Sequence, residues 1–300
     1  MAEHISPWVA ARLDDVRAKA RQWIQSPALH ALVRALDGPP GATIDELLAW
    51  TSQTLDTRSG AERRDAEPVM WSSEVLDALV RAAGPLGLLA TPTLELEAYD
   101  SVVVLGGATT GNELRTALVK DLVDGGLRVE EICGLAAHRA FSPSERDEVL
   151  VQEGVDAEWK HLLRCLDAAF GPLEAEGAMA GGVGAQPWLD HRCRGAGGQA
   201  LRLLVAPSAS SSRANTSEAV GFFLERHSDD LPRTLLVVTS AIYVPYQFFA
   251  VAGQLASGGI SHVEFIGTPT SRSGDRVVLA QRVAQEIHSA VDSAAEMLRR

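Results

Sequence analysis

The chain has 300 residues, 46% hydrophobic and 22% charged, which is enough apolar material for one large or two ordinary globular domains and excludes a disordered or fibrous chain. Its 27 basic and 39 acidic residues give a net charge of −12, which argues against a nucleic-acid partner because nucleic-acid binders carry a basic surface. No apolar run reaches the ~20 residues of a membrane helix, no secretory signal opens the chain, and the three cysteines form no Cys-x-x-Cys pair. We therefore expect a soluble cytoplasmic protein with no membrane partner and no disulfide framework.

The first 95 residues show the hydrophobic period of helices and few strand signals. Ser6-Pro7 is a helix start signal, and Thr43 begins a segment with acidic residues in its first turn, as helices prefer. The sequence therefore predicts a helical N-terminal domain over residues 1–95. Its expected helices follow Ser6-Pro7 as far as Ile24 and cover residues 27–38, 43–50 and 72–87.

Strands and helices alternate from Tyr99 onward. Five apolar, β-branched runs are typical of buried strands, at residues 100–107, 129–135, 201–207, 233–240 and 261–269. Between them lie amphipathic helices, including one that places Leu114, Leu118 and Leu122 on one face, and a long helix closes the chain. This alternation predicts an α/β domain over residues 96–300, a Rossmann-like doubly wound parallel sheet of about five strands. The Gly/Ala-rich segment at residues 177–185 is expected to be a disordered insertion rather than a mobile lid.

The loop after the first predicted strand supplies the first candidate ligand residues. In open α/β sheets, ligands bind beyond the carboxyl ends of the strands, beside helix N-termini. Glycines there let backbone N–H groups approach a ligand, and hydroxyl and amide groups add hydrogen bonds. The loop is neither Gly-x-Gly-x-x-Gly nor a Walker A loop, so it indicates no particular nucleotide, and an ordinary tight turn is the alternative. The residues concerned are Gly106, Gly107, Thr109, Thr110 and Asn112.

Two further strand ends carry polar side chains. After the second strand, Arg139 is expected to clamp a phosphate or carboxylate, and His138 is the candidate catalytic acid/base because histidine titrates near neutral pH. A hydrogen-bonded loop histidine is the alternative for His138. After the third strand, Asn215 and Thr216 precede a helix and could bind an anion, or could cap that helix together with Glu218.

The fourth strand is followed by Ser240 and Tyr243, which are expected to line the same crevice. In the polar segment before the sheet, Arg58 and Arg63 would either bind an acidic ligand or lie in a salt-bridged surface. No metal site is predicted, because the histidines near the sheet are scattered and lack paired ligands at zinc spacing. These histidines are His138, His161 and His191.

Three of these segments resemble the SanA/ElyC/YdcF-like family of Rossmann-like proteins over roughly residues 97–270. The resemblance rests on DSVVVLGG, RANTSEA and LLVVTSAIYVPYQ. The family's His-Met-x-Arg stretch is replaced here around Tyr243–Gln247, so chemistry that depends on that histidine or arginine does not carry over. The element TRSGAERR resembles a longer variant of the family, which implies that Arg58, Glu62 and Arg63 fold over the crevice.

The resemblance implies a nucleotide-like or adenosyl ligand, S-adenosylmethionine among them, and fixes no reaction. Taken together, the sequence predicts an enzyme, a transferase or hydrolase, that acts at the carboxyl ends of the strands on a polar anionic small molecule, such as a nucleotide-linked or adenosyl compound. The alternative is a non-catalytic protein that binds or senses a nucleotide or S-adenosylmethionine. Neither the substrate nor the oligomeric state follows from these residues.

Overall fold

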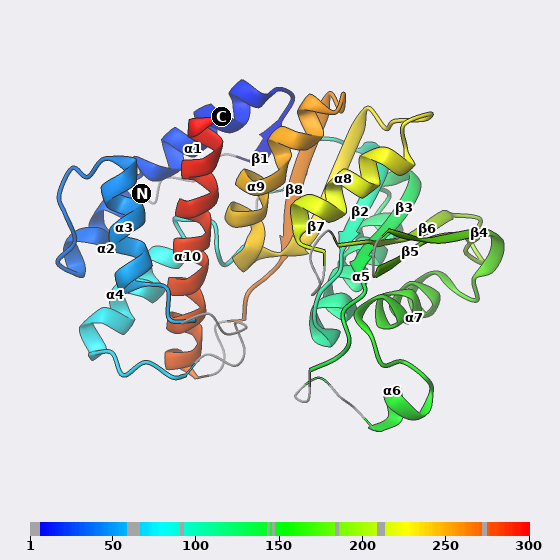
Figure 1. The fold of residues 1–300 in the computed structure, drawn as a ribbon, viewed down its shortest axis with the longest axis horizontal. Coiled ribbons are helices and arrows are strands. Elements are labelled where there is room, and N and C mark those ends of the chain that lie inside the picture. Colours follow the sequence, from blue (N-terminus) through cyan, green and yellow to red (C-terminus); the bar gives the residue numbers. More distant parts are fainter. Residues whose placement is uncertain are drawn as a thin grey trace. The chain divides into compact units, whose positions relative to one another are not determined.

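A computed structural model of the chain describes residues 7–58, 67–90, 93–142, 145, 148–183, 186–208, 214–271 and 275–300. Arg63 lies outside these residues. The chain divides into two compact units (Figure 1). The first comprises Met1–Thr93, Ser240–Gly253 and Pro269–Arg300, and the second comprises Leu94–Thr239 and Gln254–Thr268. Among the described residues, no helix has both the length and the apolar character needed to span a membrane.

The first unit is mainly helical. Its N-terminal part contains α1 (Leu13–Ile24), α2 (Pro27–Ala35), α3 (Ile44–Thr54) and α4 (Ser73–Ala83), and its C-terminal part contains η2 (Ala241–Tyr243), the start of α9 (Val244–Ser257) and α10 (Arg276–Arg299). Helices α1, α3 and α4 all pack against α10, which explains why α10 is buried along most of its length. The predicted start of α3 is confirmed, because the Thr43 side chain accepts a hydrogen bond from the Glu46 backbone N–H.

The segment after Ser6-Pro7 departs from prediction, because the helix begins only at Leu13 and Trp8–Ala10 form a short strand, β1. Trp8 and Ala10 are buried at alternate positions, as in a strand. The Trp8 ring packs edge-on against Phe248 and Phe249, with ring centroids 5.4 and 5.6 Å apart. Burial of this large ring outweighs the local helical period of the sequence.

The strands form one mixed sheet, in the order β1-β8-β7-β2-β3-β6-β5-β4. Their bounds are β2 (Ala98–Leu105), β3 (Arg128–Ala137), β4 (Glu174–Val183), β5 (Gln186–Arg194), β6 (Ala200–Ala206), β7 (Thr234–Ser240) and β8 (His262–Thr268). Strand β2 pairs in parallel with β3 and β7, and β3 pairs in parallel with β6, whereas β5 is antiparallel to both β6 and β4. The α/β class and all five predicted strands are confirmed. A purely parallel sheet of about five strands is wrong, because the described residues form a sheet of eight strands with an antiparallel edge.

The Gly/Ala-rich segment is part of this edge and is not a disordered insertion, because β4 and β5 form a hairpin. Trp188 of β5 explains why the segment is ordered. Its indole covers Gly181, where an added Cβ would lie 2.7 Å from Trp188 Nε1. The same ring packs on Phe222 of α8 (Thr216–Arg226), with centroids 5.8 Å apart. Residues 184–185 are outside the described residues.

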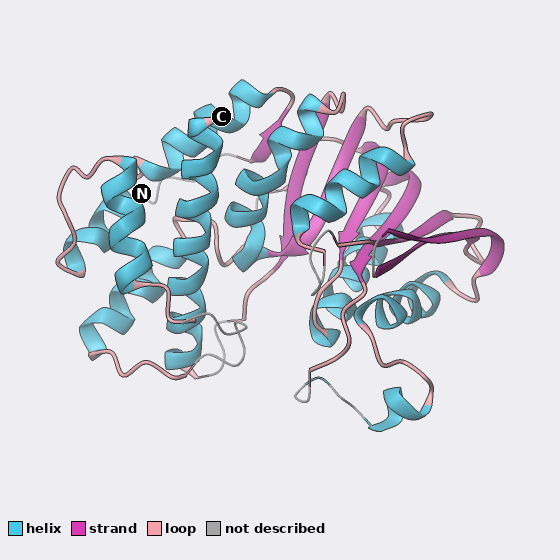
Figure 2. Cartoon of the chain, viewed as in Figure 1, coloured by secondary structure: helices cyan, strands magenta, loops and turns pink. Residues whose placement is uncertain are grey.

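Helices cover both faces of the sheet in the second unit (Figure 2). Helices α5 (Thr109–Asp124) and α7 (Glu158–Phe170) share one face, where they enclose a core that includes Val104, Ile132 and Leu162. Helix α8 packs on β3 and β6 from the other face, and the short α6 (Glu148–Gln152) precedes α7. The leucine face predicted for α5 is only partly buried, since Leu114 is exposed. The residues that α5 buries are Asn112, Arg115, Thr116 and Val119.

Candidate functional site

The loop that follows β2 is fixed by hydrogen bonds at the carboxyl ends of β2 and β3. The Gly106 N–H donates to the Leu135 carbonyl of β3 at 2.7 Å. The next N–H, that of Gly107, donates to Asn112 Oδ1 at 2.8 Å. The backbone of both glycines is therefore held in place before α5 begins.

A buried arginine, Arg115, and a half-buried one, Arg139, bind three successive carbonyl groups of this loop. Arg115 Nη1 donates to the carbonyl oxygens of Leu105 at 2.5 Å and Gly106 at 3.0 Å. Arg139 Nη2 donates to the Gly107 carbonyl at 3.2 Å. With these carbonyls turned toward guanidinium groups, the backbone conformation of the loop is set by charge-assisted hydrogen bonds.

Two buried glutamates neutralise the charge of Arg139. Its Nε donates to Glu158 Oε2 at 2.9 Å, and its Nη1 and Nη2 donate to the two carboxylate oxygens of Glu145 at 2.5 and 2.9 Å. Burial alone would raise the pKa of Glu145, but the hydrogen bonds from Arg139 and Ser142 outweigh it and lower this pKa to about 2. Four hydrogen bonds from Arg139 are thus used within the protein, so it positions the loop rather than standing free as a clamp.

Both glycines are required by this packing. A Cβ at Gly106 would lie 2.6 Å from Glu158 Oε1, and a Cβ at Gly107 would lie 2.9 Å from Arg115 Nη1. Asn112 is fully buried, and its amide is also used twice, accepting from Gly107 and donating through Nδ2 to the Glu158 carbonyl at 3.3 Å. Asn112 therefore holds the loop.

The N-terminus of α5 is open. Ala108 occupies the N-cap without a side-chain hydrogen bond, and no acidic residue lies in the first turn. The backbone N–H groups of Thr109, Thr110 and Gly111 donate no hydrogen bond to any part of the chain that the structure describes. The positive end of a 16-residue helix is thus available to an anion.

A threonine on the neighbouring strand lies at the same sheet edge. The register of β2 and β7 pairs Val104 with Val238, so Thr239 follows beside Leu105. Thr239 is fully buried, and its Oγ1 has no hydrogen-bond partner among the described residues. A buried hydroxyl without a partner is costly, by about 1–3 kcal/mol, so Thr239 is an unusual polar group at this sheet edge.

His138 follows β3 directly and precedes Arg139 in the sequence. Its ring lies edge-on to Trp159, with centroids 6.0 Å apart, and its Nε2 is buried without a partner in the described part of the chain. Burial lowers the pKa of His138, so the ring is neutral at neutral pH. A neutral imidazole is the form that accepts a proton as a general base.

The structure brings together six of the predicted site residues, and a seventh, His138, directly precedes Arg139 at the end of β3. The other described candidates lie on other elements. Asn215 caps α8 in a capping box with Glu218, and Thr216 begins that helix. Arg58, which binds Asp56 through Nε at 2.7 Å, belongs to the first unit. Ser240 and Tyr243 also fall in the first unit. Those brought together are Gly106, Gly107, Thr109, Thr110, Asn112 and Arg139.

Sequence reasoning missed the buried charges of this site, Arg115, Glu145 and Glu158. His161 of α7, which the sequence offered only as a scattered histidine, is almost completely buried, and its Nε2 lies 3.6 Å from Glu113 Oε1. One signal was available. Asn112, Arg115 and Val119 are spaced three and four residues apart, on one face of a predicted helix. Polar groups on a face that also carries a core valine indicate a buried polar contact.

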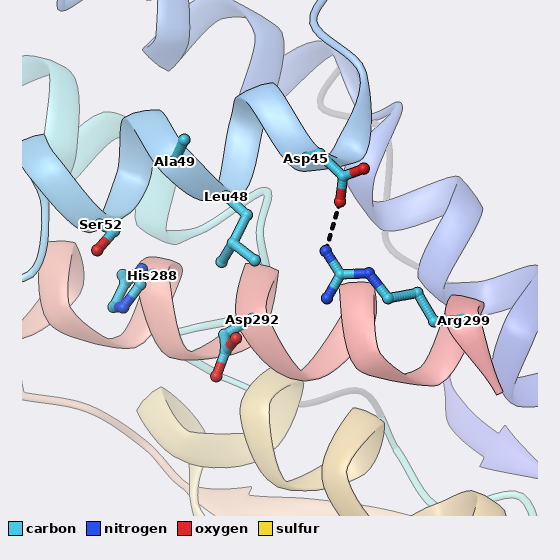
Figure 3. Close-up of a pocket in the computed structure, with 7 residues that line it drawn as sticks. All are labelled: Asp45, Leu48, Ala49, Ser52, His288, Asp292 and Arg299. Carbon is cyan, nitrogen blue, oxygen red and sulfur yellow. Dashed lines mark hydrogen bonds and ion pairs between the residues drawn. The ribbon is translucent and has the colours of Figure 1, made fainter.

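The first unit contains an open groove of about 460 Å³ between α3 and α10 (Figure 3). Its one arginine, Arg299, is paired with Asp45. The Thr51 hydroxyl donates to the Leu48 carbonyl and therefore accepts a hydrogen bond from His288 Nδ1 at 3.2 Å. Burial lowers the pKa of His288. The groove thus offers an anion no unpaired arginine, and it suits the predicted ligand less well than the loop after β2. Its lining residues are Asp45, Leu48, Ala49, Ser52, His288, Asp292 and Arg299.

Comparison with known proteins concerns the first unit. Residues 9–87 match the model of a family described as the Rv3785 N-terminal domain. This match spans α1 to α4, covers less than a third of the chain and ends before the loop at Gly106. No curated protein and no solved structure matches the chain. Among the described residues, no group of three or more His, Cys, Asp or Glu side chains could hold a metal ion.

Proposed function

We propose that the loop after β2 and the N-terminus of α5 bind the anionic group of a small polar molecule, a phosphate or carboxylate. The observation that carries this proposal is the open end of α5, set on a loop whose carbonyl groups are bound by Arg115 and Arg139. With these carbonyls held by arginines, the backbone around the ligand would need no rearrangement. Such preorganised N–H donors bind anions well.

The order of the strands supports the same location. The five predicted strands lie side by side as β8-β7-β2-β3-β6, which is 5-4-1-2-3 in their sequence order. This is the order of a Rossmann-like sheet, and its direction reverses between β2 and β7, where such sheets bind ligands. We therefore propose a Rossmann-like fold with an added antiparallel edge. The resemblance to SanA/ElyC/YdcF-like proteins agrees with this proposal, and it favours a nucleotide-linked or adenosyl ligand such as S-adenosylmethionine.

A proline substitution tests the backbone N–H groups without removing the helix. Ala108 has φ −65° and ψ 160°, a conformation that favours a following proline, and proline is well tolerated at the first position of a helix. Thr109→Pro removes one N–H and the hydroxyl, whereas Thr109→Val removes only the hydroxyl. A thermal-shift panel of phosphate, AMP, NAD and S-adenosylmethionine identifies a ligand, and calorimetry then measures its affinity for each variant.

We expect Thr109→Pro to have the same melting temperature as the wild type. Its affinity for the ligand should be lower by about tenfold or more, as expected for a lost hydrogen bond to a charged group. Thr109→Val should lose less affinity. Equal affinity of the wild type and Thr109→Pro would contradict anion binding at this helix end.

The enzyme proposal, a transferase or hydrolase, depends on His138. Its neutral imidazole next to Arg139 supports a role as general base. His138→Gln should abolish turnover of the ligand identified above and change its affinity less than about threefold. If the wild type returns that ligand chemically unchanged after long incubation, the alternative holds, and the chain is a binding or sensing protein.

A further inference from the structure

Strand β4 presents a free hydrogen-bonding edge. It is the last strand of the sheet, so one side pairs with β5 and the other pairs with no strand of the described chain. From Glu174 to Ala180 every residue is exposed, and so is Gly182. Exposure of consecutive residues means that both faces of the strand are open to solvent from Glu174 to Ala180, whereas the Trp188 indole covers Gly181.

The hairpin that carries this edge is anchored firmly. On β5, Asp190 accepts two hydrogen bonds from Arg202 of β6, at 2.7 and 2.8 Å, and one from Arg226 of α8 at 3.1 Å. Arg226 also lies over the Trp188 ring, 4.9 Å from its centroid. The open edge is therefore held in the conformation that a pairing strand needs.

Little in β4 prevents such pairing. Proteins usually protect an edge strand with lysine, proline or a bulge. The sequence of β4, EAEGAMAGGV, has neither lysine nor proline, and its one irregularity lies between Ala175 and Gly177 near its amino end. The stretch beyond Gly177 is left free.

We propose that β4 pairs antiparallel with β4 of a second copy of this chain. To recognise an extended peptide of another protein, the edge strand would need pockets between its side chains that bind the side chains of the peptide. Glycines and alanines form no such pockets, whereas a two-fold pairing gains its specificity from symmetry.

The distribution of charge agrees with a two-fold antiparallel pair. The charged residues of β4, Glu174 and Glu176, both lie at its amino end. With the axis near Met179, the Glu174 residues of the two copies would be about 34 Å apart at ~3.4 Å per residue, well beyond the Debye length. A parallel pair would instead place these carboxylates side by side.

The same symmetry brings two alanines together. A two-fold axis perpendicular to the sheet places residues of one face opposite residues of that same face. Ala178 and Ala180 share a face, where they pair with His191 and Leu189 of β5. Around an axis at Met179, Ala178 of one copy would lie opposite Ala180 of the other. One strand pair buries less than a typical stable interface, so we expect a weak dimer with a dissociation constant in the micromolar range.

Sedimentation equilibrium from about 1 to 500 µM tests the proposal, with opposite charges placed at these alanines. The wild type should pass from monomer to dimer over this range. The double variants Ala178→Lys/Ala180→Lys and Ala178→Glu/Ala180→Glu should each remain monomeric, because like charges would face each other. Their equimolar mixture should form a dimer at least as tight as that of the wild type.

Val278→Lys, which changes an exposed residue of α10 in the first unit, is the control and should dimerise like the wild type. A monomeric wild type at 500 µM overturns the proposal. So does dimerisation of the lysine variant with wild-type affinity. Failure of the folded lysine and glutamate variants to associate when mixed also overturns it.

Discussion

At the scale of single residues, a methyl group at either of the two glycines after β2 would collide with a charged side chain of the site. Gly106→Ala would place its Cβ against the buried carboxylate of Glu158, which also binds Arg139 and cannot move without breaking that ion pair. We expect a loss of about 1–3 kcal/mol in the free energy of unfolding, as for other overpacked sites. Urea denaturation measures it. Gly177→Ala is the matched control, because an added Cβ at Gly177 would have no atom of a non-neighbouring residue within 4 Å. This variant should leave the free energy of unfolding unchanged.

Glu145 should give the site a distinct acid dependence. Its pKa in the folded protein is about 2, below its ordinary value of 4.5, so the unfolded state takes up the proton first as pH falls. The stability that Glu145 contributes is thus fully present above pH 4.5 and is lost as pH falls toward 2. The difference in unfolding free energy between the wild type and Glu145→Gln should therefore shrink over that range. At neutral pH we expect this difference to be about 2 kcal/mol or more, since the variant leaves part of Arg139 unpaired.

Denaturant titrations at pH 2.5, 3.5, 4.5 and 6 would measure the difference, with the exposed Glu130→Gln as control. If the difference in unfolding free energy stays constant with pH, Arg139 does not lower the pKa of Glu145.

At the scale of elements, the cap of α8 distinguishes two interpretations of Asn215. Its Oδ1 accepts from the Glu218 N–H at 2.9 Å, and Glu218 Oε2 accepts from the Asn215 N–H at 2.8 Å. Asn215→Ala should lower the free energy of unfolding by about 1 kcal/mol, and Thr43→Ala, at the similar box of α3, should do the same. Calorimetry with the ligand should show no change in affinity for Asn215→Ala. A tenfold loss would restore Asn215 as a ligand residue.

The helices and strands were predictable where the local sequence determines the secondary structure. Buried strands are short apolar runs, and all five that the sequence predicts are present. The errors arose where tertiary contacts decide. Trp8 lies in a strand because Phe248 and Phe249 bury it. The glycines of β4 look like loop residues, but Gly181 is needed beneath Trp188. On α5, Arg115 is buried in place of Leu114 because guanidinium binding to the loop carbonyls outweighs burial of one leucine.

At the scale of the whole molecule, the location of the candidate site was predictable but its internal charges were not. The carboxyl ends of the strands follow from the strand–helix alternation alone, and the glycine loop lies there. Glu145 and Glu158 are six and nineteen residues from Arg139 in the sequence, and no local pattern joins them. Likewise, α10 belongs to the same unit as the N-terminal helices, a long-range association that periodicity does not encode.

Buried histidines in both units should make the whole chain acid-sensitive in a second pH range. Burial lowers the pKa values of His138 and His161 in the second unit and of His288 in the first. Each folded pKa lies below the ordinary value of 6.5, so below that pH the unfolded state binds more protons than the folded one. The free energy of unfolding should therefore decrease as pH falls through 6.5, before the contribution of Glu145 to stability is lost. Urea midpoints at pH 8, 6.5 and 5.5 measure this decrease, which His161→Gln should reduce and the exposed His30→Gln should leave unchanged. Equal midpoints at pH 8 and 5.5 would show that these imidazoles are protonated as readily in the folded chain as in the unfolded one.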